Sequence, residues 1–183
     1  AQQALAAAER VTEIIDQPLE VVPSKNAVAL DHVQGEMAFE NVSFAYKDGA
    51  PVLKNVSFTA RPGMYVALVG PTGVGKSTAV KLATRFYDPL GGRITLDGHD
   101  LRDITMESLR RHIAYVPQDT YLFNMTVAEN IAFARPEATR EEIEAAAKIA
   151  RIHEDILQMP DGYDTLVGER GMKLSGGRKQ RSA

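Results

Sequence analysis

The fold is decided by one stretch near the middle of the chain, Gly70-Pro71-Thr72-Gly73-Val74-Gly75-Lys76-Ser77, which has the form G-x-x-x-x-G-K-S. Its glycines allow the backbone to curl until successive N–H groups point inward, where they can donate to phosphate oxygens. We expect Lys76 to reach the β- and γ-phosphates of a nucleotide, and Ser77 to offer its hydroxyl to Mg²⁺. A purely structural turn would need neither side chain.

The residues on both sides of this phosphate-binding loop (the P-loop) predict a strand and a helix. Residues 64–69 form a short apolar run, which indicates a buried strand, and residues 78–86 have a helical pattern. The helix would add the positive end of its dipole at the phosphates. The residues expected to bind nucleotide here are Gly70, Thr72, Gly73, Val74, Gly75, Lys76, Ser77 and Thr78.

The composition is that of one globular domain of ordinary size with its own core: 183 residues, 44% hydrophobic and 25% charged. A net charge of −3 gives no electrostatic footprint for nucleic acid. The absence of cysteine excludes disulfides, thiol catalysis and cysteine-bound metals. The chain has neither a signal-peptide pattern nor an apolar run of about 18 residues, so we expect no direct insertion of this segment into a membrane.

Periodicity and turn residues predict the order of the remaining elements. An antiparallel pair of strands is expected at 36–44 and 52–59, and further strands at 91–98 and 113–116. Helices are expected at 1–16, 106–111, 126–133 and 139–149. The predicted organisation is a helical linker at 1–17, a linker at 18–35, and one α/β domain at 36–183 whose helical subdomain spans about 119–175.

A second glycine motif, Leu174-Ser175-Gly176-Gly177, follows the P-loop by about 100 residues. A serine and two glycines that open a helix make another anion-binding helix N-terminus. One nucleotide has a single γ-phosphate, so two such sites on one chain need an explanation. A symmetric head-to-tail dimer supplies it, because Ser175, Gly176 and Gly177 of one chain would close over the ATP held by the other.

With both motifs in place, the sequence resembles the nucleotide-binding domain of ATP-binding-cassette (ABC) transporters from residue 35 to residue 183. The P-loop matches that family's Walker A motif, and residues 174–177 match its signature motif. Gln118 matches the glutamine that in the family contacts Mg²⁺ and the attacking water. Tyr46, 24 positions before Gly70, stands where the family places a ring on adenine. Core packing at a strand end would explain Tyr46 by itself equally well.

The resemblance implies a P-loop NTPase fold of the RecA-like α/β class, with an antiparallel β-subdomain and a helical signature subdomain. The implied cofactors are ATP and Mg²⁺. The implied catalytic residues are Lys76 and Gln118, and the implied metal contacts are Ser77 and Gln118. The other nucleotide contacts would come from Tyr46, the P-loop and the signature motif.

Three local features resemble the exporter branch of the family. Residues 6–16 are similar to the segment that follows the last transmembrane helix, and residues 119–131 to the stretch that grips the coupling helices. Residues 169–171 are similar to the exporter cross-linking loop. The implied partners are a second nucleotide-binding domain, in a head-to-tail homodimer, and the coupling helices of a transmembrane domain. The implied location is the cytoplasmic face of a bacterial inner membrane.

The sequence departs from the family at its end, because Ala183 precedes the family's Walker B aspartate, catalytic glutamate and switch histidine. By their order in the chain, Asp97, His99, His112 and His153 cannot replace these groups. Glu154 and Asp155 cannot either, because they lie in a helical stretch with no apolar strand before it. Phosphoryl transfer needs a group that orients water. We therefore expect this chain to bind nucleotide better than it hydrolyses it. The C-terminal core strands of the family's fold are missing as well, which would leave apolar surface and strand edges uncovered. Arg178 and Ser182 differ from the family's usual residues, and Arg178 is expected only to tune the site.

Three interpretations stay open. The first is the ATPase motor of an ABC exporter, in which ATP binding drives dimerisation. The second is a soluble ABC ATPase of DNA repair or translation, which the exporter-like features and the lack of a basic face disfavour. The third, for this chain alone, is a non-catalytic nucleotide-binding or interaction module. The transported substrate would be selected by transmembrane residues that this sequence does not contain.

Overall fold

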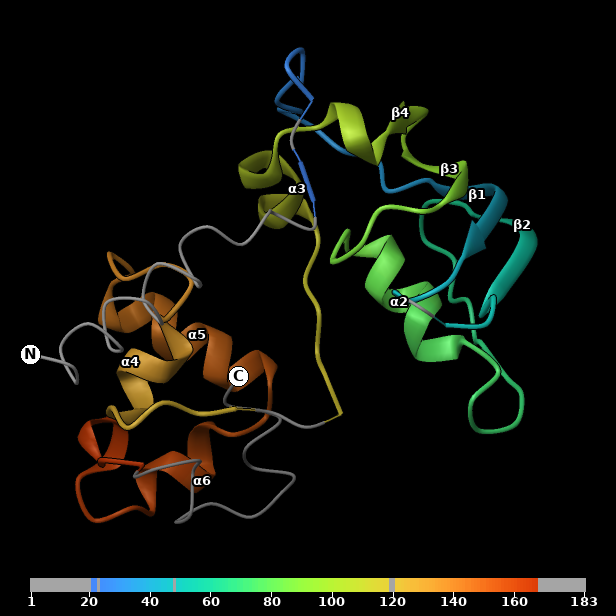
Figure 1. The fold of residues 1–183 in the computed structure, drawn as a ribbon. Helices are drawn as coiled ribbons and strands as arrows, with labels where there is room; N and C mark the ends of the chain where they lie inside the picture. The colour runs from blue at the N-terminus through green and yellow to red at the C-terminus, as the bar shows by residue number, and fades with distance from the viewer. Residues whose placement is uncertain (1–20, 23, 48, 119–120, 168–183) are drawn as a thin grey trace, which may run out of the picture. The chain divides into compact units, whose positions relative to one another are not determined.

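The structure, a computed structural model, describes residues 21–22, 24–47, 49–118 and 121–167. These residues form two compact units, which divide after Ala114 (Figure 1). The helix expected at 1–16 and the signature motif at 174–177 lie outside the described residues, so both stay predictions. Across the described part of the chain, none of the helices is long and apolar enough to cross a membrane.

The first unit is built on a four-stranded antiparallel sheet in the order β2-β1-β3-β4. The antiparallel pair expected at 36–44 and 52–59 is confirmed, and Phe39 stacks on Phe58 across it. The strands are β1 (Met37–Phe44), β2 (Leu53–Ala60), β3 (Gly91–Leu96) and β4 (His99–Asp100).

The approach of β3 to β1 requires a glycine at position 92. The register shifts between Glu40 and Ser43, and Gly92 beside it has φ 73°. A Cβ at Gly92 would overlap the carbonyl oxygens of Glu40 and Asn41. Only glycine therefore lets the two backbones come this close in a left-handed conformation.

Two helices and a 3₁₀ turn accompany the sheet: α2 (Lys76–Ala83), η1 (Leu101–Asp103) and α3 (Met106–His112). Helix α2 buries Ala79 and Leu82 in the same core as Phe39 and Ile94 of the sheet. This burial fixes α2, whose first residue is Lys76 of the P-loop. Helix α3 extends one residue beyond the predicted 106–111, and its N-terminus is capped by the Thr105 side chain.

The buried strands predicted at 64–69 and 113–116 are wrong in this structure. Neither segment belongs to a strand, and Tyr65 and Val69 are 103% and 90% exposed. A strand is held by hydrogen bonds to a neighbour, and the described residues place no such neighbour beside either segment. The uncovered apolar surface expected from the sequence is therefore present. It includes a cleft of about 180 Å³ between Phe58, Val66, Leu68 and Val80.

Residues 24–36, which we call the strap, run beside η1 and α3 (blue in Figure 1). Val28 forms a parallel bridge with Ile104: its N–H donates to Asp103 O at 2.8 Å, and its carbonyl accepts from Thr105 N–H at 2.9 Å. Leu30 N–H donates to the Ser108 hydroxyl at 2.8 Å. The strap is thus held by backbone and side-chain hydrogen bonds, although it contains no helix or strand longer than that bridge among its described residues.

Asp97 fixes the end of the strap next to β1. Its carboxylate accepts the backbone N–H groups of Gln34, Gly35 and Glu36 at 2.6, 3.0 and 2.8 Å. Asp97 itself has φ 49° in the turn between β3 and β4. The sequence interpretation of Asp97 as a turn residue is confirmed.

The second unit is helical, with α4 (Val127–Ile131), α5 (Arg140–Ile149), α6 (His153–Leu157) and η2 (Gly162–Asp164). Thr126 and Thr139 each form a capping box, with Glu129 and Glu142 respectively, so α4 and α5 begin one residue after the predicted 126 and 139. The hydrogen bond from Thr126 N–H lowers the pKa of Glu129, which stabilises its charged form in the box. The helices enclose a core of Leu122, Val127, Ile143, Ala147, Ile152, Ile156, Tyr163 and Val167.

Candidate nucleotide-binding site

The P-loop enters α2 through glycines in left-handed or otherwise strained conformations. Gly70, Gly73 and Gly75 have φ 154°, 85° and 100°. A Cβ at Gly75 would lie 2.8 Å from a Leu53 side-chain carbon and 3.2 Å from Val52 O. The chain can therefore turn into the helix here only without a side chain. The sequence-predicted residues Thr72, Gly73 and Val74 lie exposed at the tip of this loop.

The N-terminus of α2 is open to an anion. Gly75 is its N-cap, and within the described residues no side chain caps the helix and no acidic residue stands in its first turn. The first N–H groups of an α-helix have no partner inside the helix, and they carry the positive end of its dipole. A phosphate placed here would receive several hydrogen bonds together with a favourable field.

Lys76 places a cation across the same loop. Its half-buried side chain turns back, and Nζ donates to Gly70 O at 2.8 Å and to Pro71 O at 2.7 Å. The ammonium is therefore held at the P-loop before any phosphate arrives. Ser77, the next residue, is exposed at the start of the helix, where its hydroxyl is accessible to a hydrated ion.

Tyr46 comes to the first turn of α2 from the end of β1. Its hydroxyl lies 3.1 Å from Oγ1 of the buried Thr78, and its ring meets Phe44 and Tyr87 edge to face, with centroids 5.1 and 5.4 Å away. The ring is 36% exposed. Tyr46 is thus packed and still accessible, so the two interpretations left open by the sequence are compatible. Tyr87, which the sequence analysis did not single out, holds the ring in its orientation.

We expect Tyr46→Ala to weaken ATP binding by about 3- to 10-fold, because it removes the ring contact with adenine, which is worth about 0.5–1.5 kcal/mol. Tyr46→Phe keeps the ring and should cost less than about 3-fold. Calorimetric titration with Mg-ATP measures both variants, and Tyr65→Ala serves as the control because Tyr65 is fully exposed. Equal affinities of the Ala variant and the wild type would show that Tyr46 is a packing residue only.

Four predicted contacts, Gln118, Ser175, Gly176 and Gly177, lie outside the described residues of the first unit. Gln118 is an exposed bend residue of the second unit, whereas Lys76 and Ser77 belong to the first. Its role at Mg²⁺ therefore stays a prediction. Ser175, Gly176 and Gly177 lie outside the described residues, so their closure over a partner's nucleotide stays a prediction as well.

The side chains available as metal ligands in the first unit fit a Mg²⁺ that is bound together with a nucleotide, rather than a metal held by the protein alone. No cluster of three or more His, Asp or Glu side chains that could hold a metal occurs among the described residues. Magnesium bound with a nucleotide takes most of its ligands from phosphate oxygens and water, and needs few from the protein. The single exposed hydroxyl of Ser77 at the mouth of the P-loop is consistent with that coordination.

The second unit carries an aromatic groove formed by Tyr121, Phe123 and Phe133. Phe123 stacks on Phe133 with centroids 4.2 Å apart, and Tyr121 meets Phe123 edge to face at 5.1 Å. Tyr121 and Phe133 are 61% and 52% exposed, and the groove encloses about 140 Å³. The buried Asn130 amide holds its floor by accepting from Phe123 N–H at 2.8 Å and donating to Thr126 O at 2.9 Å. The sequence analysis missed Phe133.

The chain matches the sequence model of the ABC transporter family over residues 53–183. The chain belongs to the ABC transporter family. Within that family it is similar to "Heavy metal tolerance protein" of Schizosaccharomyces pombe, with 51% identity over 182 residues that cover 100% of this chain and 22% of that protein. It is also similar to "ATP-binding cassette sub-family B member 6" of Homo sapiens, with 50% identity over 96% of this chain and 21% of that protein.

A solved ABC structure, described as a bacterial Atm1-family ABC exporter with ATP bound, agrees with this assignment. It superposes with a TM-score of 0.89 at 47% identity, and the match covers 99% of this chain and 32% of that one. The predicted P-loop NTPase fold and the predicted similarity to ABC exporters are confirmed. The chain spans about a fifth of the length of the two curated relatives.

Proposed function

We propose that this chain is the nucleotide-binding part of an ABC exporter motor, which binds Mg-ATP at the P-loop and couples its hydrolysis to transport across a membrane. The observation that carries the proposal is the open N-terminus of α2 with the Lys76 ammonium held across it. Within the longer protein, ATP binding would join two such domains head to tail at the cytoplasmic face. Hydrolysis would separate them again.

Each residue of the site has a distinct task in this mechanism. The backbone N–H groups of the P-loop and Lys76 bind and orient the phosphates, and Ser77 would hold the Mg²⁺, which neutralises charge on the phosphates. Tyr46 places the adenine. Gln118 would orient the attacking water, and Ser175 of a second chain would close over the γ-phosphate. The ATP that is bound in the similar solved exporter supports the first part of this assignment.

We also propose that the aromatic groove is the surface that receives a coupling helix of the transmembrane part. Tyr121 and Phe133 are exposed, and Phe133 stacks on Phe123, which is typical of sites that bind a partner's apolar side chains. Asn130 holds the loop and helix that carry them in one arrangement. A movement of the ATPase domain could therefore be transmitted through this groove to the membrane part, because the side chains of the groove would not rearrange first.

The function is tested on the full-length protein in lipid vesicles by measuring Mg-ATP binding and phosphate release. We expect Phe133→Asp to keep ATP affinity but to lower phosphate release by at least about tenfold, because a charge in the groove opposes docking of the membrane part. Leu157→Asp, at another exposed apolar position of the same unit, is the matched control. It should behave like the wild type.

Two results would contradict the proposal. If the wild type binds Mg-ATP but releases no phosphate, the non-catalytic module is the better description. If the wild type hydrolyses ATP equally fast with and without its membrane part, and Phe133→Asp has no effect, the soluble ABC ATPase is favoured.

A further inference from the structure

Helix α2 ends with an arginine at the position after the helix where glycine is usually found. Arg85 has φ 50°, a left-handed conformation that usually belongs to glycine. Its N–H donates to Leu82 O at 2.9 Å, and the N–H of Phe86 donates to Lys81 O at 2.8 Å, which together make a Schellman motif. A residue with a Cβ is strained in this conformation, because the Cβ crowds the following carbonyl oxygen. The strain indicates that the arginine side chain has a role that glycine could not fill.

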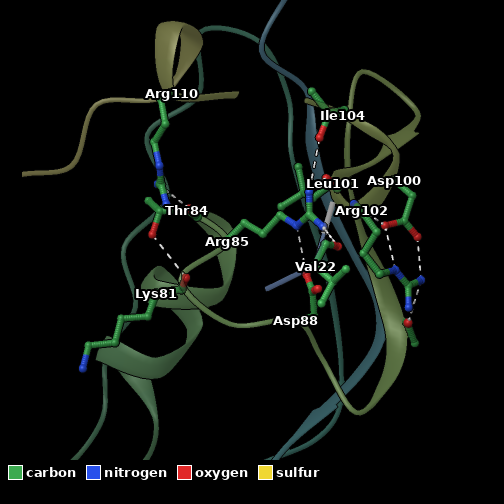
Figure 2. Close-up of polar contacts among 11 residues, drawn as sticks. Val22, Lys81, Thr84, Arg85, Asp88, Asp100, Leu101, Arg102, Ile104 and Arg110 are labelled. Atoms are coloured by element: carbon green, nitrogen blue, oxygen red, sulfur yellow. Dashed lines mark hydrogen bonds and ion pairs between the residues drawn. The ribbon is translucent and has the colours of Figure 1, made fainter. Parts of the chain in front are cut away.

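The Arg85 guanidinium joins three segments that are distant in the sequence (Figure 2). It is 1% exposed, and it pairs with Asp88 just beyond the helix through Nε at 3.0 Å. Nη1 donates to Leu101 O at 2.8 Å and to Ile104 O at 3.2 Å, and Nη2 donates to Val22 O at 3.3 Å. The end of the ATP-binding helix, the η1 turn and the N-terminal segment are therefore bonded to one buried cation.

A second arginine reinforces the same connection from α3. Arg110 donates to Thr84 O, the C-cap carbonyl of α2, at 2.6 Å (Figure 2). Its guanidinium also lies 4.9 Å from the centre of the Phe86 ring. The residues between η1 and α3 carry the bridge to Val28 of the strap. The contacts therefore run without a gap from α2, through Arg85 and Ile104, to the strap.

We propose that Arg85 is a positioning residue that couples the ATP-binding helix to the strap. Helix α2 has eight residues and is about 12 Å long, so a shift that phosphates impose at Lys76 is transmitted to Arg85 by a rigid element. The order of the strap then depends on the bound nucleotide. By linkage, docking of the strap raises nucleotide affinity by the same factor. The inference rests on the proposed function, because it needs ATP to bind at the P-loop.

Hydrogen exchange of the full-length protein tests the coupling, with and without Mg-ATP. The reporters are the N–H groups of Val28 and Thr105, which bond to Asp103 O and Val28 O across the bridge. In the wild type we expect Mg-ATP to slow exchange at both amides by about fivefold or more. In Arg85→Gly that slowing should disappear, and ATP affinity should fall by a similar factor. Glycine is the residue preferred at this helix end, so α2 should keep its termination.

Arg102→Gln is the matched control. Arg102 pairs with Asp100 beside η1 and reaches Gly92 O, and its substitution should leave the nucleotide effect at Val28 unchanged (Figure 2). Arg85→Lys is the second variant if Arg85→Gly does not fold. A lysine keeps the charge but lacks the planar fork that reaches four acceptors, so we expect a partial loss of the slowing.

The outcomes separate this inference from the proposed function. If Mg-ATP binds to the wild type but does not slow exchange at Val28 and Thr105, or if the slowing survives in the Arg85 variants, the coupling is overturned while the ATP site stands. Loss of protection throughout β1 and β2, with and without ATP, would show a purely structural role and would also overturn it. Failure of the wild type to bind Mg-ATP contradicts the proposed function itself.

Discussion

Lys76→Ala is expected to weaken Mg-ATP binding by at least about a hundredfold. The ammonium now bonds to two carbonyls of the P-loop at 2.7 and 2.8 Å, within reach of an anion bound at the start of α2. A hydrogen bond to a charged group is worth about 1.5–3 kcal/mol, and about 2.7 kcal/mol corresponds to a hundredfold change in affinity. The substitution removes the only P-loop side chain that carries a positive charge, so no neighbouring group of the loop can replace it.

Titration with a fluorescent ATP analogue measures this loss, and Lys81→Ala provides the control. Lys81 stands in the last turn of the same helix, away from the P-loop, so its removal should leave ATP affinity within about twofold of the wild type. Circular dichroism of both variants checks that α2 remains folded. An unchanged affinity of a folded Lys76→Ala variant would overturn the P-loop assignment.

Ser175→Arg in the full-length protein is expected to abolish ATP-driven dimerisation and to leave ATP binding to each domain intact. The proposed role of Ser175 is to face the γ-phosphate held by the other chain, where only a small residue fits between helix N-terminus and phosphate. A long side chain would hold the two domains apart. Light scattering in the presence of Mg-ATP measures the dimer.

Ser175→Ala is the conservative companion of that variant. It keeps the small size but removes the hydroxyl, so it should weaken the dimer without abolishing it. If Ser175→Arg still forms the ATP-dependent dimer at wild-type concentrations, Ser175 does not close the partner's site, and the head-to-tail arrangement is contradicted.

The parts of the fold that local chemistry determines could be predicted from the sequence. The P-loop could be located because its glycines at 70, 73 and 75 and its Lys-Ser pair are the residues that a backbone curled around phosphate requires. Each of these glycines has a positive φ in the structure. The starts of α4 and α5 were predicted within one residue from the helical patterns that begin at Thr126 and Thr139. The structure adds the reason, because each threonine forms a capping box with the glutamate three positions later.

The features that the sequence did not predict depend on contacts between distant segments. An apolar run such as 64–69 has the composition of a buried strand, but it becomes one only where a neighbouring strand receives its hydrogen bonds. The strap has no periodicity, and its attachment depends on Ser108 and Asp97, which bond to its backbone from 60 or more positions away. Arg85 is a basic residue after a helix, and nothing in the sequence marks its left-handed conformation or its burial.

We propose that the N-terminus of α2 and the P-loop bind the phosphates of ATP. Nuclear magnetic resonance of the ¹⁵N-labelled chain, titrated with Mg-ATP, tests it most directly. We expect large shifts of the backbone N–H signals of Gly73, Gly75, Lys76 and Ser77, with smaller shifts in β3 and α5. Unmoved signals from these four residues at saturating Mg-ATP, or shifts confined to other parts of the chain, would contradict it.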